Sequence, residues 1–375
     1  MSIVDILCHP YRIPLRTGVS TAHGKLAVRS GAILEVRSAS GHIGYGDAAP
    51  LADFHAETLA SVLQSLTPLL TQLQGREPLA ALSTLYNLLD SVKLPSATVF
   101  GLEVALLDLV SKMRGVPLYS QLLHDSGKGK SAIPVNAVIG ASGIDETVQA
   151  ARMAVQRGFR CLKLKVANGL SEEDEIARIA AVRQAVGSDV GLRLDANEHW
   201  DFERAVRVLN ACASYDIQYV EQPFRAYDLD SMYRLRQEVA IPVAADEAVY
   251  NLENARRIVA WEAADILIIK PQMTGGLYMS RQIIHEATRH NVQCVVTDAM
   301  ESGIGVVATL HLAAASPEVT LPCGLATLDL LADDLLLEAL PIEQGSMTVP
   351  AGPGLGMSLD QDALKKYAVK EVRGE

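Results

Sequence analysis

Gly191-Leu-Arg-Leu-Asp195 and Ile217-Gln-Tyr-Val-Glu221 decide the fold of this chain, because each is a short apolar run that ends in a carboxylate. Similar runs lie on both sides of these two, at residues 134–139, 161–166, 241–246, 265–270 and 292–297. Amphipathic stretches separate the runs, among them residues 145–157, 172–186, 202–214 and 280–290. Strand-like runs that alternate with helical patterns predict βαβ units and a parallel sheet.

The runs recur at a regular interval along the chain. Five of them close at Lys165, Asp195, Glu221, Asp246 and Lys270, which are spaced by 30, 26, 25 and 24 residues. A period of this length, repeated about seven times, is what a (β/α) barrel of the TIM type requires. A doubly wound sheet has the same alternation, but no Gly-x-Gly-x-x-Gly motif follows the first strand, so the barrel is favoured.

The segments outside the barrel predict a second module. The run at 31–37, a turn and the run at 42–47 indicate an antiparallel hairpin or meander, and apolar residues at helical spacing follow at 57–73 and 98–113. Strands followed by helices, without alternation, are typical of an α+β module. We therefore divide the chain into an α+β module, the barrel and a C-terminal segment that returns to the module, over 1–128, 129–342 and 343–375.

Composition excludes several classes of function. Hydrophobic residues make up 49% of the 375, and the net charge of −11 comes without any basic run, so nucleic acid is not an expected partner. The five cysteines are scattered without Cys-x-x-Cys spacing, which argues against disulfides and for a reducing compartment. No stretch is an export signal or a membrane span. We expect a cytoplasmic protein that acts on a small molecule. The sequence leaves open whether the protein forms a homo-oligomer.

Polar side chains close the strand-like runs, where parallel barrels place their active sites. In chain order they are Lys163, Lys165, Asp195, Asn197, Glu221, Asp246, Lys270, Thr297, Asp298 and Glu301. Carboxylates that converge at one barrel mouth repel each other unless a cation lies between them. Mg²⁺ fits Asp195, Glu221 and Asp246 because it prefers oxygen ligands, and Mn²⁺ is the alternative. The competing interpretation is that each acid caps a helix or pairs with a surface lysine.

The lysines complete a reaction site. Lys163 and Lys165 share one face of a strand, where the like charge and a metal would lower the pKa of Lys165 from its usual ~10.4. Lys270 ends a strand on the far side of the barrel. Such a site suits removal of a proton next to a substrate carboxylate, with the metal holding the enediolate. The alternative, a solvent-facing strand edge, fits poorly with strands that helices cover.

At these residues the chain resembles the enolase superfamily, in its muconate-lactonizing subgroup. The shared motifs are Lys163-x-Lys165, Asp195-x-Asn197, Glu221-Gln-Pro223, Asp246-Glu247, Lys270-Pro271 with Gly275-Gly276, and Pro353-Gly-Leu-Gly356. The resemblance implies a capping domain, built from both chain ends, over a modified TIM barrel. It also implies Mg²⁺ on Asp195, Glu221 and Asp246, Lys165 as acid and base, and Lys163 and Lys270 assisting, with Glu247 beside the site.

Within that subgroup, several segments resemble the o-succinylbenzoate synthase family of menaquinone biosynthesis. They are Gly44-Tyr-Gly-Asp47 with Pro50-Leu-Ala-Asp-Phe-His-Ala-Glu-Thr58, residues 296–305, and Gly324-Leu-Ala-Thr-Leu328. This resemblance implies syn dehydration of 2-succinyl-6-hydroxy-2,4-cyclohexadiene-1-carboxylate. It also implies that His23 and Phe54 lie in segments that close over the barrel mouth and set specificity.

Three residues depart from that family's pattern. Asp47 stands where Glu is usual, Asp298 where Ser is usual, and Ala326 where Asp is usual. A carboxylate at 298 would repel a succinyl tail and suit an ammonium, which leaves an N-acylamino acid racemase, a dipeptide epimerase or a muconate cycloisomerase as alternatives. Gly324 and Ala326 replace the Asp-x-Asp of dipeptide epimerases. A non-catalytic binding barrel is the remote alternative, but it predicts a missing lysine or carboxylate, and all are present.

Overall fold

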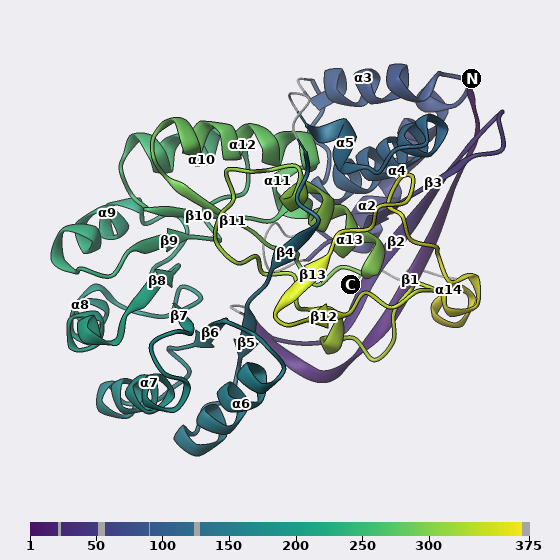
Figure 1. Ribbon diagram of the computed structural model, residues 1–375. Coiled ribbons are helices and arrows are strands. Elements are labelled where there is room, and N and C mark those ends of the chain that lie inside the picture. The colour runs from purple at the N-terminus through teal and green to yellow at the C-terminus, as the bar shows by residue number, and fades with distance from the viewer. Residues whose placement is uncertain (22–23, 52–56, 90, 124–127, 370–375) are drawn as a thin grey trace.

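The computed structural model describes residues 1–21, 24–51, 57–89, 91–123 and 128–369. It has the two predicted parts, an N-terminal antiparallel sheet with helices and a curled parallel sheet surrounded by helices (Figure 1). The predicted fold class, a modified (β/α) barrel with an α+β capping domain, is therefore confirmed. The exact boundaries at 128 and 342 stay predictions. None of the helices in the described part is long and apolar enough to cross a membrane.

The capping domain begins with a sheet in the order β1-β2-β3, formed by Ile3–Thr21, Gly24–Ser38 and Ile43–Ala48. Among the described residues, the helices that follow it are α2 (Leu59–Leu73), α3 (Pro78–Leu89), α4 (Ser96–Arg114) and α5 (Tyr119–Leu122). Helix α4 packs directly on β3, because the strand presents Gly44 and Gly46 to it. A Cβ added at Gly46 would lie 2.0 Å from the carbonyl oxygen of Gly101, so only glycine permits this approach.

The barrel sheet is parallel, in the order β11-β10-β9-β8-β7-β6-β5. Its strands are β5 (Ala137–Ile139), β6 (Cys161–Lys165), β7 (Gly191–Asp195), β8 (Ile217–Glu221), β9 (Val243–Ala245), β10 (Ile266–Ile269) and β11 (Gln293–Val296). The helices outside it are α6 (Ile144–Gln156), α7 (Glu172–Val186), α8 (Phe202–Ala211), α9 (Leu229–Glu238), α10 (Leu252–Ala260), α11 (Pro271–Thr274), α12 (Leu277–Arg289) and α13 (Gly303–Ala314), with a 3-10 turn at Ala213–Tyr215. Helices cover the outer face of the strands, as a barrel requires (Figure 1).

Two residues close the ring between β11 and β5. Gly324 forms a parallel bridge with Thr297, and Cys323 forms one with Val135. The amide of Gly324 donates to the carbonyl of Val296 (2.9 Å). This closing segment was not predicted as a strand, because a two-residue pairing leaves no apolar run in the sequence.

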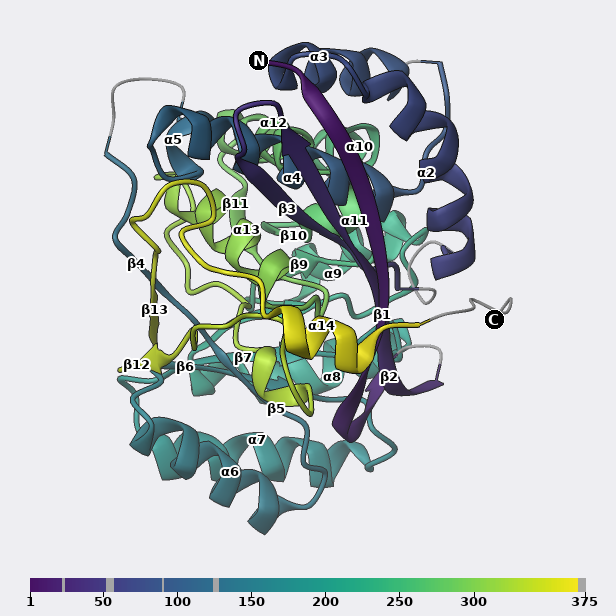
Figure 2. The ribbon, with the colours of Figure 1, turned by 90° about the vertical axis from the view of Figure 1, so that its right-hand side faces the viewer.

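The C-terminal segment runs back along both parts. Its strands β12 (Ile342–Glu343) and β13 (Ser346–Thr348) pair in the order β12-β13-β4 with β4 (Ala132–Pro134), after a 3-10 turn at Leu328–Leu330. Helix α14 (Gln361–Tyr367) then lies beside β1, where Ala368 bridges Tyr11 (Figure 2). The amide of Leu355 donates to the buried carboxylate of Asp108 in α4 (2.7 Å). The chain end thus completes the capping domain.

Candidate active site

The parallel register brings the predicted site residues to one edge of the barrel. Lys165 pairs with Asp195 across β6 and β7, and Asp195 pairs with Glu221 across β7 and β8. Asp246 directly follows β9, and Lys270 directly follows β10. Because all these strands are parallel, their carboxyl ends share one mouth of the barrel, where the structure gathers the three acids and three lysines.

Ion pairs connect the lysines to the acids. The ammonium of Lys163 lies 2.7 Å from Glu221 Oε1 and 3.1 Å from Asp195 Oδ2. The ammonium of Lys165 lies 2.7 Å from the same Asp195 oxygen, and that of Lys270 lies 2.6 Å from Asp246 Oδ2. Lys165 and Lys270 are thus held by different carboxylates. Three strands of the sheet separate β6, which ends at Lys165, from β10, which Lys270 follows.

Burial sets the electrostatics of this cluster. Asp195 and Glu221 are each 1% exposed, and Asp246 is 5% exposed. Burial raises the pKa of Glu221, and the nearby Asp195 charge raises it further. Burial also disfavours the charged form of Asp195, but Lys163 and Lys165 outweigh that effect and lower its pKa. Burial lowers the pKa of Lys163, yet Asp195 and Glu221 raise it well above its usual value.

Three buried carboxylate oxygens of the cluster receive no hydrogen bond from the residues that the structure describes. They belong to Glu221 (Oε2), Asp246 (Oδ1) and Glu247 (Oε2). Uncompensated carboxylate oxygens of this kind fit a hard cation such as Mg²⁺. However, the described residues contain no group of three or more His, Cys, Asp or Glu side chains already arranged to hold a metal. Lys163 instead bonds both Asp195 and Glu221, so a shared metal on these acids stays a prediction.

Asn197 and Glu247 support Lys165 from the next loops. Asn197 accepts from Lys165 through Oδ1 (2.5 Å) and donates from Nδ2 to Glu247 Oε1 (3.2 Å). Asn197 adopts a positive φ of 42°, a conformation that Asn tolerates better than most residues. Sequence reasoning assigned no role to Gln222, which is fully buried. Its Oε1 accepts from the amide of Asp246 (2.8 Å), so it links the loops after β8 and β9.

The residues after β11 have separate roles. Thr297 donates to the carbonyl of Gly324 (2.6 Å), so it closes the barrel. Asp298 accepts through Oδ1 from the amide of Met300 and from the hydroxyl of Thr327, both at 2.8 Å. Glu301 accepts from Gln272 Nε2 (3.0 Å) in the buried interior. His23 and Phe54, which were expected to cover the mouth, lie outside the described residues.

Buried hydrogen bonds of Arg29 and Asp47 join the capping domain to the barrel, and we call this contact region the seam. Arg29 of β2 donates to the carbonyls of Ala49 and Pro50 and, across the seam, to that of Met300 (2.9 Å). Asp47 accepts from the Tyr11 hydroxyl and from the amide and hydroxyl of Ser302 (2.9 and 2.7 Å). Tyr11 and Ser302 carried no signal in the sequence, because their partners are hundreds of residues away or on another strand.

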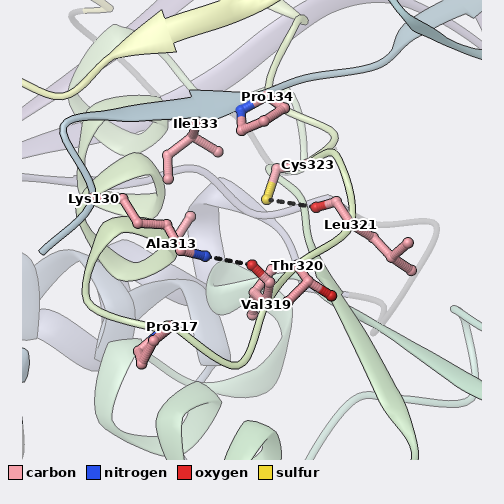
Figure 3. Close-up of a pocket in the computed structure, with 9 residues that line it drawn as sticks. All are labelled: Lys130, Ile133, Pro134, Ala313, Pro317, Val319, Thr320, Leu321 and Cys323. Carbon is pink, nitrogen blue, oxygen red and sulfur yellow. Dashed lines mark hydrogen bonds between the residues drawn. The ribbon is translucent and has the colours of Figure 1, made fainter.

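A cavity of about 310 Å³ lies away from the acids and lysines. It is lined by Lys130, Ile133, Pro134, Ala313, Pro317, Val319, Thr320, Leu321 and Cys323 (Figure 3). Ile133 and Pro134 precede β5, and residues 319–321 precede the two residues that close the ring, so this cavity lies toward the opposite end of the barrel. Lys130 in it already donates to the carbonyls of Ser316 and Val319. We therefore place the site at the acids and lysines and not in this cavity.

Comparisons with known proteins match both parts of the chain. Residues 146–363 match the enolase C-terminal domain-like family, and residues 5–109 match the MenC N-terminal domain. A hydrophobic dipeptide epimerase from Enterococcus faecalis is 30% identical over 96% of this chain and 100% of that protein. An o-succinylbenzoate synthase from Thermobifida fusca is 37% identical over 59% of this chain and 67% of that protein.

Solved structures give the same result. The dipeptide epimerase from Enterococcus faecalis, complexed with Mg and the dipeptide L-Leu-L-Tyr, has a TM-score of 0.88 and 28% identity, covering 96% of this chain and 100% of that chain. The N-succinyl Arg/Lys racemase from Bacillus cereus has a TM-score of 0.90 and 25% identity, covering 98% of each chain. These proteins share the fold of this chain over almost its whole length.

Proposed function

Because this chain belongs to the enolase superfamily, as its motifs predicted, we propose that it is an enzyme that removes the proton next to a carboxylate of a small-molecule substrate. One observation carries the proposal: Lys165 and Lys270 are each fixed by a buried carboxylate, on strands that face each other across the barrel mouth. A base and a second cation on opposite sides of a bound substrate are what such a reaction needs.

The residues that would hold Mg²⁺ are Asp195, Glu221 and Asp246. The donor set consists of carboxylates, and unpartnered oxygens of Glu221 and Asp246 support a further cation there. When bound, the ion would neutralise the substrate carboxylate and stabilise the enediolate. The Mg complex of the dipeptide epimerase from Enterococcus faecalis supports this assignment.

Lys165 is the base in this proposal. Its ammonium is oriented by two oxygens, Asp195 Oδ2 and Asn197 Oδ1, and Glu247 in turn fixes the amide of Asn197. After losing a proton, Lys165 Nζ takes the α-proton of the substrate. Lys163 favours the charged forms of the two acids on its side, because it bonds both Asp195 and Glu221.

The specific reaction we propose is o-succinylbenzoate synthesis in menaquinone biosynthesis. Lys165 takes the α-proton of 2-succinyl-6-hydroxy-2,4-cyclohexadiene-1-carboxylate and returns it to the departing hydroxide, so that water leaves from one face. Lys270 lies on the other face as a cation that stabilises the enediolate. The match to the MenC N-terminal domain and the identity with the Thermobifida fusca synthase support this choice.

The second candidate is racemisation or epimerisation of an amino-acid derivative. It is favoured because Lys270 is a second proton carrier opposite Lys165, so a proton removed on one face can be replaced on the other. The Enterococcus faecalis epimerase and the Bacillus cereus racemase, which share the fold over nearly the full chain, support it.

One experiment tests both candidates. The protein with Mg²⁺ in D₂O is given the cyclohexadiene substrate or N-acylamino acids, and products and Cα deuterium are followed by NMR. Formation of o-succinylbenzoate, lost in Lys165→Ala, supports the synthase, whereas deuterium at Cα without dehydration supports the racemase. Activity that survives EDTA contradicts the metal assignment, and exchange that survives Lys165→Ala contradicts the base.

A further inference from the structure

Asp298 is a buried acid, and among the described residues only one of its two carboxylate oxygens has hydrogen-bond donors. It follows β11 at the same barrel edge as Lys270, and its side chain is 3% exposed. Oδ1 accepts two hydrogen bonds, from the amide of Met300 and from Thr327. Oδ2 receives none from the residues that the structure describes. Burial raises the pKa of Asp298 to about 6, even though both of these donors favour the charged form.

The cations that act on Asp298 are engaged elsewhere. Lys270 donates to Asp246 at 2.6 Å. The guanidinium of Arg29 donates to the carbonyls of Ser30, Ala49, Pro50 and Met300. Both contribute at a distance to the charge balance of Asp298, but neither hydrogen-bonds Oδ2. A buried carboxylate oxygen without a donor is costly, so this position favours a ligand that supplies one.

An apolar cluster includes Ala299, the residue that follows Asp298. Leu51, Met273 and Ala299 form a small cluster separate from the main core, and Leu26 and Met300 pack against it. Leu51 comes from the capping domain, Met273 lies three residues after Lys270, and Ala299 directly follows Asp298. An aliphatic chain that ends in a cation matches an apolar cluster beside an unpaired carboxylate.

We propose that Asp298 selects substrates that carry an ammonium or guanidinium at the end of an aliphatic side chain, which donates to Oδ2. The inference rests on the proposed proton abstraction by Lys165, and it adds the substrate class: N-acylated amino acids of the lysine and arginine type. The same carboxylate repels an acidic tail, so Asp298 favours the second candidate reaction over the first. The Bacillus cereus relative, an N-succinyl Arg/Lys racemase, is consistent with this class.

The test compares two substrates of nearly equal shape. Wild-type protein with Mg²⁺ in D₂O is given N-succinyl-L-lysine or N-succinyl-L-norleucine, which lacks the ammonium, and kcat/KM for loss of the Cα proton is measured by NMR. We expect a preference for the lysine derivative of ~10-fold or more, the factor that one charge-assisted hydrogen bond provides. In Asp298→Asn the ratio falls toward one.

The variants are matched to separate recognition from folding. Asn at 298 keeps a carbonyl oxygen for Met300 and Thr327 and replaces the charged Oδ2 by an NH₂ group, which cannot accept. Asp298→Ser is the second variant if the first does not fold. Asp362→Asn makes the same change of charge on a side chain that is 94% exposed, and its ratio should equal that of the wild type. A wild-type ratio near one, or a ratio that Asp298→Asn leaves intact, overturns the inference. Absence of exchange with both derivatives, together with no dehydration of the cyclohexadiene substrate, overturns the proposed function instead.

Discussion

Gln222 shows how one side chain that never touches the reacting groups can set their positions. It is fully buried, and its Oε1 accepts from the amides of Asp246 and Ala248, while its Nε2 donates to the carbonyl of Phe224. The Glu-Gln-Pro motif was visible in the sequence, but the role of its glutamine was not. Its partners lie in the loop after the next strand, so the contact depends on the register of the sheet.

We predict that Gln222→Ala lowers the free energy of unfolding by about 2–4 kcal/mol, because three buried backbone groups lose their partners. Activity falls as well, since the amide of Asp246 is released. Urea unfolding at constant pH measures the first effect. A loss of less than about 0.5 kcal/mol would contradict the assigned role, and Gln293→Ala at the exposed start of β11 is the control.

Glu103 links the capping domain to the barrel and gives a prediction about pH. Its oxygens accept from the Tyr86 hydroxyl and from the amides of Leu277 and Tyr278 at the start of α12. Burial raises its pKa to about 7, above the 4.5 of an unfolded chain. The folded state therefore holds the proton more tightly, and the stability from this group is complete below pH 4.5 and is lost as the pH rises through 7.

We expect Glu103→Gln to gain roughly 3 kcal/mol of unfolding free energy relative to the wild type when the pH rises from 4.5 to 8. Glutamine does not titrate, and the two proteins share all other acids, so the contributions of those acids to the pH dependence cancel in the comparison. Urea unfolding of both proteins across this range is the measurement. Two curves that run parallel would show that folding does not raise the pKa of Glu103.

At the scale of the elements, β3 and α4 lie in close contact. A Cβ at Gly46 would lie 2.0 Å from the carbonyl oxygen of Gly101 and 2.8 Å from the amide of Ala105, both backbone atoms that cannot turn aside. We predict that Gly46→Ala destabilises the protein by about 1–3 kcal/mol, measured as a shift in the urea midpoint. Gly140→Ala, whose Cβ meets nothing within 4 Å, should change stability by less than about 0.5 kcal/mol.

The elements also show which parts of the fold could be read from the sequence. Strands β6 to β10 were predicted because each is an apolar run with a charged end at a regular interval, and the same ends gave the acids and lysines. The closure of the barrel by Cys323 and Gly324 was not predicted, because a pairing of two residues has no periodicity in the sequence. The hydrogen bonds of Asp298 could not be predicted either, since the bridge between Thr297 and Gly324 is what brings Thr327 near Asp298.

At the scale of the whole molecule, Arg29 connects the two domains at the barrel mouth. Its guanidinium bonds the carbonyls of Ala49 and Pro50 and, through that of Met300, the loop that carries Asp298. A lysine ammonium cannot reproduce this planar set of donors. We predict that Arg29→Lys raises KM by ~10-fold or more while kcat changes less, because the loops move and the lysines stay in place. Steady-state kinetics measure this, and an equal fall in kcat with KM unchanged would contradict it.

The return of the chain to its beginning has a consequence for biogenesis. Ala368 bridges Tyr11, and the amide of Val369 donates to the carbonyl of Pro10, so the first strand gains its last partner from the final residues. The whole barrel lies between these two segments in the sequence, so a ribosome delivers β1 long before its partner. The N-terminal sheet of the nascent chain therefore stays incomplete until the barrel and α14 have been synthesised, and removal of α14 and the residues after it would leave a complete barrel beside a capping domain that lacks this partner.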